Sequence, residues 1–370
     1  MKRKAIWVAA LLALVTACDA APPAEPARAP VVYGEQDDRR EYYEASEADQ
    51  RLTRESIVAL ISPTALDFAD PSDVGLNAYS LQEAYGLCDD QRFLEQPSAA
   101  GCSGTLIDDD LILTAGHCFD EEDPQASCRS QRFVFNYHYT TPGELATIDA
   151  GRDVYSCRQV LVRRDDDVDG LRRDYAIIQL DRPVSGAHVP APIAPGSDPA
   201  VPGDTFSVIG FGSGLPAKID TSGEVILSFD GPLDFFTGSI DTFGGNSGSG
   251  VFNDSGRVIG ILVRGATDYI DRGDCKVVNE IEAEPDRGGE SISYVATAVT
   301  ALCDTEWPSL RVCGTERSCG DGMCTGIETA DNCSEDCDAA TCNDGVCDAT
   351  EDEVSCPEDC FVAEDVVPAE

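Results

Sequence analysis

The sequence predicts an all-β fold, either a barrel or a sandwich. Apolar runs of strand length, such as SIVALIS, YAIIQLD, TFSVIGFG and SISYVATAV, recur along the chain with turn residues between them. Hydrophobic residues make up 42% of the chain and aromatic residues 7%, which is enough for a core, and Gly and Pro interrupt the sequence often. No long helical pattern is evident, so short strands are the main predicted element.

The charge of the chain restricts its partners. The 370 residues carry a formal net charge of −42. Binding to a phosphate backbone needs a cationic surface, so nucleic acid is excluded as a partner. The excess of acidic residues favours solubility, in salty surroundings or with divalent cations present, and charge alone does not separate these cases.

The N-terminus has the pattern of an export signal. Lys2, Arg3 and Lys4 precede an apolar stretch that is too short to span a bilayer, so residues 1–17 are predicted to be a signal peptide. The VTAC stretch resembles the lipobox of bacterial lipoproteins, which makes Cys18 the predicted lipidation site; the alternative is an incidental cysteine in an ordinary signal peptide. The Pro- and Ala-rich residues 18–30 then form a tether. The chain has 17 cysteines, and setting Cys18 aside leaves an even number that can pair.

The C-terminus contains two copies of one cysteine pattern. Residues 319–337 and 342–360 repeat the same cysteine spacing and have little apolar content, so they form a separate acidic module held by disulfides. A spacer or adhesion unit is the favoured interpretation, and a calcium site on its carboxylates is the minor alternative. Zinc is disfavoured because exported thiols oxidise and the module has no His.

One of the three histidines stands out. His117 follows an apolar strand in CSGTLIDDDLILTAGHCF, between Cys102 and Cys118, and a disulfide between these two cysteines would hold its imidazole in place. His138 is expected on a half-exposed strand and His188 in a loop. His117 is therefore the candidate general base.

The segment around His117 resembles the cysteine-flanked histidine segment of the trypsin-like serine peptidases. The resemblance implies the chymotrypsin fold over residues 31–310: two six-stranded antiparallel β-barrels with the active site between them. It also implies a carboxylate at the head of a buried strand, and RRDYAIIQLD gives that role to Asp174. The acidic run 165–169 is an alternative source of the carboxylate, but no apolar strand holds it, so it is predicted to be a solvated loop.

The GGNSGSG stretch matches the nucleophile motif of that family at Gly245, Ser247 and Gly248, in the required order after His117 and Asp174. Ser247 is the predicted nucleophile. The glycines let the N–H groups of Gly245 and Ser247 point at one spot as an oxyanion hole.

Asn246 departs from the family pattern, which has an Asp before the serine to pair with a new N-terminal ammonium. GNSGS is similar to the bacterial branch that includes the glutamyl endopeptidases. That branch also has a segment like VVYGEQDDRR (31–40) at its mature N-terminus, so processing is expected near Val31. Such a cut would release the body from its lipid.

The substrate pocket is predicted from Asp241, Thr242, Leu262 and Arg264. Asp241 matches the position of the basic-specific Asp of trypsin, with an Asp that caps a turn at the pocket's rim as the alternative. Leu262 stands where glutamate-specific members carry a His, which weighs against glutamate preference, whereas Arg264 would invite an acidic side chain. The pocket preference stays open at this point.

The combined prediction is an exported serine endopeptidase, either a lipoprotein of the cell envelope or secreted. It needs no metal or organic cofactor, acts on protein or peptide substrates, touches the membrane through its lipid alone, and is expected to be a monomer. An inert protease-like binding protein that displays the repeats is the main alternative, and an esterase is another. Cys128 and Cys157 are a second pairing suggested by their proximity in sequence.

Overall fold

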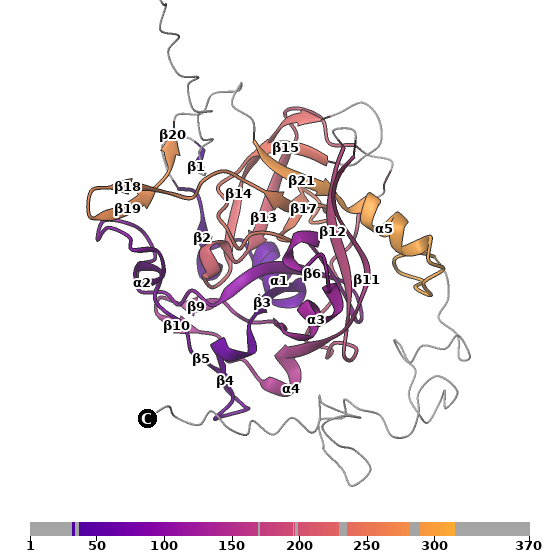
Figure 1. Ribbon diagram of the computed structural model, residues 1–370, viewed down its shortest axis with the longest axis horizontal. Coiled ribbons are helices and arrows are strands. Elements are labelled where there is room, and N and C mark those ends of the chain that lie inside the picture. The colour runs from indigo at the N-terminus through magenta and orange to yellow at the C-terminus, as the bar shows by residue number, and fades with distance from the viewer. Residues whose placement is uncertain are drawn as a thin grey trace, which may run out of the picture.

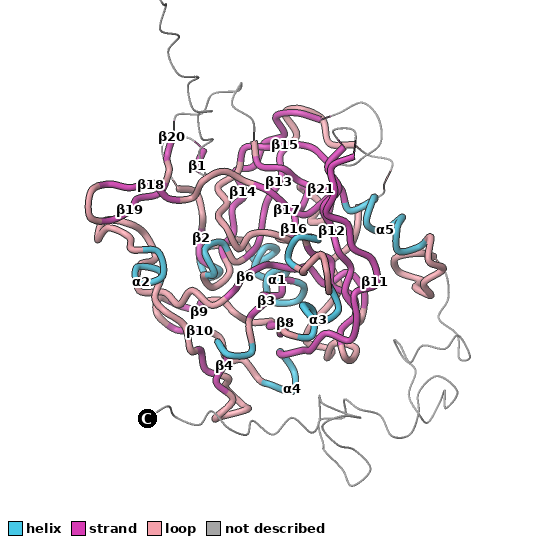
Figure 2. The backbone as a smooth tube through the Cα atoms, viewed as in Figure 1, coloured by secondary structure: helices cyan, strands magenta, loops and turns pink. Residues whose placement is uncertain are grey.

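Strands are the main regular element of the described chain, as the magenta segments of Figure 2 show. The computed structural model describes residues 32–33, 37–168, 171–194, 196, 199–228, 235–281 and 289–314. The predicted signal peptide, Cys18 with its tether, and the two cysteine-rich repeats lie outside the described residues.

Six antiparallel strands close the first barrel (Figure 1). In spatial order they are β11 (Val154–Val168), β12 (Leu171–Leu180), β7 (Leu111–Thr114), β6 (Ala100–Asp108), β3 (Ile57–Ile61) and β8 (Arg132–Val134). Strand β3 has the sequence IVALI and is buried along its whole length, which suits its branched aliphatic residues. Leu106, Ile112 and Phe133 pack in the same buried cluster.

A second set of six antiparallel strands closes because its first and last strands also pair with each other. In spatial order they are β13 (Thr205–Gly210), β16 (Gly250–Asn253), β17 (Val258–Arg264), β21 (Glu290–Tyr294), β15 (Phe235–Ser239) and β14 (Lys218–Ser228), with β2 (Arg40–Glu41) added beside β14. A Cβ on Gly223 or Gly238 would approach ring carbons of Phe206 to 2.6 and 2.5 Å. These two glycines therefore make room for a core aromatic ring. The predicted pair of six-stranded barrels is confirmed.

The two barrels share one apolar cluster. It contains Leu113 of β7 and Ile177 of β12 from the first barrel, and Ile209 of β13 and Ile261 of β17 from the second. Burial of this common surface is the main force that fixes one barrel against the other. The ends of β7 and β12 are thereby held beside the loop that precedes β16.

Short helices and two-stranded ribbons surround the barrels. The helices are α1 (Glu47–Ser56), α2 (Leu81–Tyr85), α3 (Pro124–Arg129), α4 (Ala150–Asp153) and α5 (Val295–Cys303), with 3-10 turns η1 (Tyr42–Glu44), η2 (Pro63–Ala65), η3 (Gly116–Cys118) and η4 (Gly212–Gly214). The ribbons are β1 (Val32–Tyr33) with β20 (Glu280–Ile281), β4 (Leu66–Asp67) with β5 (Gly75–Leu76), β9 (Tyr139–Thr141) with β10 (Glu144–Leu145), and β18 (Tyr269–Arg272) with β19 (Cys275–Val278). Within the described ranges, every helix is too short or too polar to cross a membrane.

Four disulfide bonds cross-link the described residues. The structure contains the two bonds expected from the sequence, Cys102–Cys118 and Cys128–Cys157. It adds Cys88–Cys275, which ties the segment after α2 to β19, and Cys303–Cys313, which closes the segment after α5. The sequence alone had left these last four partners open.

A buried ion pair fastens the N-terminal segment to the second barrel. Lys218 of β14 is 3% exposed, and its Nζ donates hydrogen bonds to Glu41 Oε2 (3.1 Å), Gln96 Oε1 (2.9 Å) and the Pro216 carbonyl (2.8 Å). Burial lowers the pKa of Lys218 to about 8, against the opposing effect of Glu41. The charge of Lys218 thus depends on Glu41.

Replacing Glu41 by Gln should lower the free energy of unfolding by about 3 kcal/mol, because the change leaves a buried ammonium without its counter-ion. Urea denaturation at pH 7 measures this loss. Glu95→Gln is the matched control, since Glu95 is exposed and its change should stay within about 0.5 kcal/mol. Equal stability of the two variants would contradict the assigned role of Glu41.

Candidate active site

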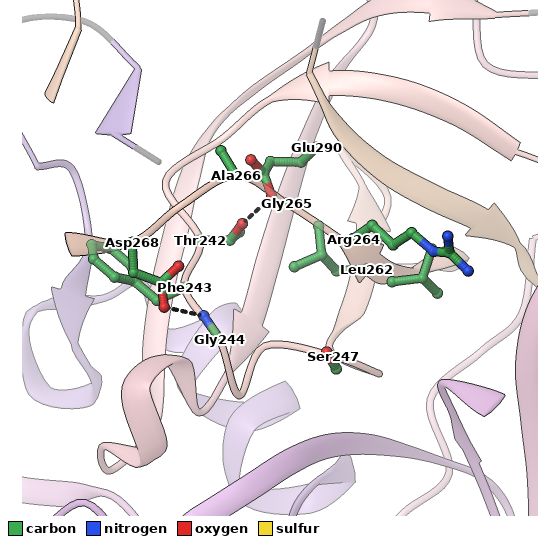
Figure 3. A pocket seen from close by; sticks show the side chains of 11 residues that line it. Thr242, Phe243, Gly244, Ser247, Leu262, Arg264, Gly265, Ala266, Asp268 and Glu290 are labelled. Carbon is green, nitrogen blue, oxygen red and sulfur yellow. Dashed lines mark hydrogen bonds between the residues drawn. The ribbon is translucent and has the colours of Figure 1, made fainter. Parts of the chain in front are cut away.

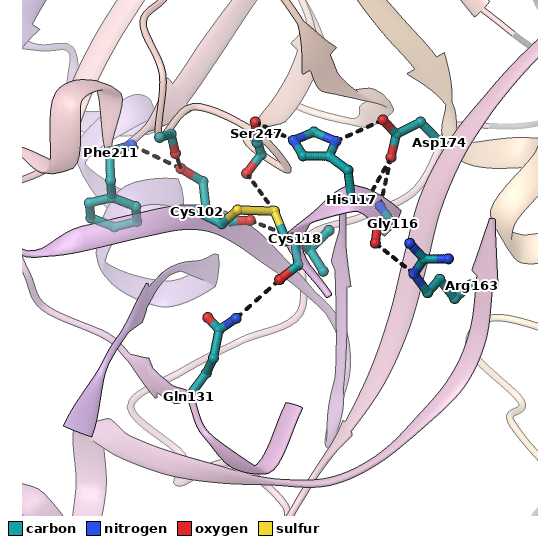
Figure 4. The surroundings of a disulfide bond; sticks show 12 residues. Cys102, Gly116, His117, Cys118, Gln131, Arg163, Asp174, Phe211 and Ser247 are labelled. Atoms are coloured by element: carbon teal, nitrogen blue, oxygen red, sulfur yellow. Dashed lines mark hydrogen bonds and ion pairs between the residues drawn. A yellow bond between two sulfur atoms is a disulfide. The ribbon is translucent and has the colours of Figure 1, made fainter. Parts of the chain in front are cut away.

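The structure brings His117, Asp174 and Ser247 together from three separate segments. Turn η3, directly after β7, carries His117; β12 carries Asp174; and the loop between β15 and β16 carries Ser247. Nδ1 of His117 lies 2.7 Å from Asp174 Oδ2, and its Nε2 lies 2.7 Å from Ser247 Oγ. Figure 4 shows the three side chains in one line.

Asp174 is held rigidly by backbone donors. Its side chain is 1% exposed, and its Oδ1 accepts hydrogen bonds from the N–H groups of Gly116 (2.8 Å) and His117 (3.2 Å). A carboxylate at Oδ2 keeps the proton of His117 on Nδ1, so Nε2 is free to accept the Ser247 hydroxyl proton. A Cβ at Gly116 would lie 1.9 Å from the carbonyl oxygen of Arg164, so a side chain does not fit there.

Ser103 connects the histidine segment to the serine loop, and it was not among the residues predicted from the sequence. Its N–H donates to the carbonyl oxygen of Ser247 (2.8 Å) and its Oγ to that of Gly245 (2.8 Å). Its own carbonyl accepts from Thr114 Oγ1 (2.7 Å). Ser103 follows Cys102, whose disulfide to Cys118 lies next to His117 (Figure 4). Its position directly after Cys102, in the CSG triplet, was the sequence feature that could have identified it as a residue of the site.

The serine loop adopts backbone angles that only glycine tolerates well. Gly245 has φ +99° and Gly248 has φ +85°. A Cβ on Gly248 would lie 2.1 Å from the carbonyl oxygen of Ser103. Within the described chain, the N–H groups of Gly245 and Ser247 donate no hydrogen bond, whereas that of Gly248 donates to the Leu262 carbonyl (2.7 Å). Two backbone donors beside Ser247 are therefore left for another group.

Asn246, the residue before the serine, is buried. Its N–H donates to the carbonyl of Phe243 (2.9 Å). Its Oδ1 has no hydrogen-bond partner among the described residues. A neutral amide here offers no charge for a buried ammonium, which agrees with the departure noted from the sequence.

A pocket of about 300 Å³ opens beside Ser247 (Figure 3). Three of the predicted pocket residues, Thr242, Leu262 and Arg264, line it. The remaining lining residues besides Ser247 are Phe243, Gly244, Val263, Gly265, Ala266, Asp268 and Glu290. Asp268 and Glu290 were missed because they belong to segments without a recognisable motif.

Asp241 was predicted as a pocket residue, with a structural role at a turn as the alternative, and the structure does not place it in the pocket. It is not among the residues that line the pocket. Its carboxylate accepts hydrogen bonds from the backbone N–H groups of Tyr33 (2.8 Å) and Asp38 (2.7 Å) and so serves the N-terminal segment. Burial raises the pKa of Asp241 to about 7.

Arg264 lies at the side of the pocket nearest the histidine and the aspartate. Its guanidinium donates to Asp165 Oδ1 (3.1 Å), and its Nε lies 3.8 Å from Asp174 Oδ2. The acidic run was expected to form a solvated loop, but residues up to Val168 extend β11 instead. Arginines on β12 and β17 offset these acids and stabilise the strand, since Asp166 pairs with Arg173 and Asp165 with Arg264.

The other two histidines are buried. His188 lies in a loop, as expected, but His138 is neither half-exposed nor part of a strand. His138 packs against the ring of Tyr42, and burial lowers its pKa to about 4. His188 lies against Phe135, with its Nε2 3.0 Å from Asp153 Oδ1. Neither contacts Ser247.

The described residues hold no group of three or more His, Cys, Asp or Glu side chains that could bind a metal ion. The hydrogen-bonded set at Ser247 is made of side chains and backbone N–H groups from this chain. This donor and acceptor set suits acyl transfer to a hydroxyl.

Known proteins resemble this part of the chain. The model of the family described as a trypsin-like peptidase domain matches residues 102–261. Snake venom serine proteinase 8 of Crotalus adamanteus is 30% identical over 117 residues, which is 32% of this chain and 41% of the relative. The thrombin-like enzyme contortrixobin of Agkistrodon contortrix contortrix is 31% identical over 119 residues, 32% of this chain and 45% of the relative.

The chain thus spans less than half the length of these curated relatives. The matched segment includes His117, Asp174 and Ser247. Residues 102–261, together with the two closed six-stranded barrels, are thus similar to a trypsin-like peptidase domain.

Proposed function

We propose that the protein is a serine endopeptidase in which Ser247, His117 and Asp174 form the catalytic triad. The observation that carries this proposal is the continuous set of hydrogen bonds from Asp174 through His117 to Ser247 at the mouth of a pocket. An inert binding protein has no need for this geometry, so the adhesion alternative is disfavoured.

The proposed reaction proceeds through an acyl-enzyme. Ser247 Oγ attacks the scissile carbonyl carbon while its proton passes to Nε2 of His117. Asp174 stabilises the resulting imidazolium, which then protonates the leaving amine as the C–N bond breaks. Water attacks the ester with His117 again as base, and the carboxylic acid product leaves Ser247 with its proton restored.

The oxyanion that forms in each step needs donors at a fixed point. The N–H groups of Gly245 and Ser247 are the proposed donors, because both are free of partners among the described residues. Such preorganised donors contribute about 2.7–4 kcal/mol each to transition-state stabilisation. Ser103 positions them through its bonds to the Gly245 and Ser247 carbonyls.

Export and processing are part of the proposal. The four disulfides support an oxidising compartment, and the signal peptide with Cys18 supports a lipoprotein of the cell envelope or a secreted protein. We also propose kinship with the glutamyl-endopeptidase-type branch on the GNSGS motif, with processing near Val31, without its glutamate preference because Leu262 replaces the His. The C-terminal repeats are proposed as a spacer or adhesion unit.

Removing any member of the proposed triad should abolish reaction with a serine-directed fluorophosphonate or slow peptide cleavage about 10⁴-fold or more. Ser247→Ala should lose labelling completely, and Asp174→Asn should cut kcat/KM because His117 then takes the wrong tautomer. The exposed Ser255→Ala is the control and should label like the parent. Full labelling of Ser247→Ala would refute the assigned nucleophile.

Gly248→Ala should cut the rate of fluorophosphonate labelling about 10²-fold, because its Cβ would lie 2.1 Å from the Ser103 carbonyl and displace the oxyanion donors. Gly143→Ala is a matched control, since Gly143 also has positive φ (+82°) but no atom within 4 Å of its added Cβ. Labelling rates and urea denaturation are measured for both variants. Equal labelling rates would show that the close approach at Gly248 does not position the donors.

A further inference from the structure

The end of the pocket opposite Ser247 is closed by a buried carboxylate (Figure 3). Glu290, the first residue of β21, is 1% exposed and lines the pocket. Its Oε2 accepts a hydrogen bond from Thr242 Oγ1 (2.7 Å) and its Oε1 from the Tyr33 hydroxyl (3.2 Å). No Lys or Arg of the described ranges pairs with it, and the two side chains that donate to it are neutral.

Glycine gives the pocket access to this carboxylate. A Cβ on Gly265 would lie 1.9 Å from Glu290 Oε2, so a side chain at this position would cover or displace the acid. The neighbouring wall consists of Val263 and Ala266, which are apolar and small. A long side chain with an apolar stem and a polar tip matches a pocket with apolar walls and a charged end.

The second carboxylate of the pocket strengthens its negative character. Asp268 lines the side of the pocket away from Arg264 (Figure 3), where its Oδ2 accepts a hydrogen bond from the Gly244 N–H (2.8 Å). Burial raises the pKa of Asp268. Neither acid of the pocket is paired with a cation within the described chain.

Arg264 does not neutralise the far end of the pocket. Its side chain is 41% exposed and bonded to Asp165, and Figure 3 shows its guanidinium directed away from Glu290. An acidic substrate side chain would therefore meet a guanidinium that is already paired, and two carboxylates beyond it. This charge distribution disfavours acidic side chains.

We propose that Glu290 is the specificity-determining residue of this pocket and that it selects Lys or Arg on the amino side of the scissile bond. The inference rests on the proposed peptidase activity and names the substrate class of that same site. The ammonium or guanidinium of the substrate would supply the counter-ion that Glu290 lacks, and Gly265 would let it approach.

The pKa of Glu290 in the unliganded pocket agrees with this role. Burial raises the pKa of Glu290 to about 8, with Asp268 adding to the rise and the bonds from Thr242 and Tyr33 opposing it. A neutral Glu290 must release its proton when a cation binds. Cation affinity should therefore rise as pH increases to about 8 and then level off.

The titratable and charged groups that face Glu290 from the packed elements are Tyr33, Asp268 and, behind Tyr33, Asp241. Burial also raises the pKa values of Tyr33 and Asp241. Arg39 lies beyond Asp268 and is paired with Asp37. None of these groups supplies the positive charge that a substrate would bring.

The decisive test uses the processed full chain and peptides that differ only at the residue before the scissile bond, namely Lys, Arg, norleucine, Glu and Phe. The parent should cleave the Lys and Arg peptides about 100-fold better, in kcat/KM, than the norleucine and Glu peptides. Glu290→Gln keeps the shape and the bond from Thr242 and should remove that advantage. The exposed Glu224→Gln is the matched control and should keep the parent preference.

The outcomes separate the two proposals. A parent that labels with fluorophosphonate but prefers Glu or Phe, or a Glu290→Gln variant that keeps the preference for Lys and Arg, overturns the role of Glu290 and leaves the peptidase proposal standing. A parent that neither labels nor cleaves overturns both.

A measurement on the unaltered chain covers the case in which Glu290→Gln does not fold. Benzamidine should protect Ser247 from labelling, and its neutral analogue benzamide should not. The protection constant for benzamidine should increase by up to about tenfold per pH unit between pH 6 and 8. Equal protection by the two compounds would contradict a carboxylate that binds cations.

Discussion

The carboxylate of Asp174 is the interaction on which the arrangement of the candidate site depends. It is buried in the first barrel, where it accepts two backbone N–H groups and faces Nδ1 of His117. Burial of a charge is costly unless several donors meet it, and these three donors come from one turn, η3. Arg264 of the second barrel approaches the same oxygen that faces His117. The Asp174 carboxylate therefore affects both the tautomer of His117 and the position of Arg264 at the side of the pocket.

The parts of this site that the sequence predicted are those in which a short segment imposes its own geometry. His117 lies between disulfide-bonded cysteines, Ser247 lies among glycines with positive φ, and Asp174 is the first residue of the buried run in β12. Each of these local patterns restricts the conformation of its own short segment, so each role can be predicted without knowledge of the fold. The barrels followed from the resemblance that these patterns carry and from the repeated strand-like runs.

The residues that were missed depend on contacts between distant segments. Glu290 reaches the pocket because β21 pairs with β17 in a register that sets Ser291 beside Arg264 and Ile292 beside Leu262. Nothing in the ESISY sequence reveals that register. Asp241 was misplaced for the same reason, since its partners Tyr33 and Asp38 lie more than 200 positions earlier in the chain. Side-chain direction at such positions is decided by tertiary packing, which a motif cannot encode.

The contacts of the N-terminal segment bear on the proposed processing near Val31. Val32 is fully buried against Phe243, and the next residue, Tyr33, donates its N–H to Asp241 and its hydroxyl to Glu290. A cut before Val32 preserves all three contacts, in agreement with the proposed site near Val31. A cut after Tyr33 would remove one donor from each of two buried carboxylates and an apolar side chain from the wall behind the serine loop. Since an unsatisfied buried acceptor costs about 1–3 kcal/mol, the pocket itself favours a mature chain that retains Val32 and Tyr33.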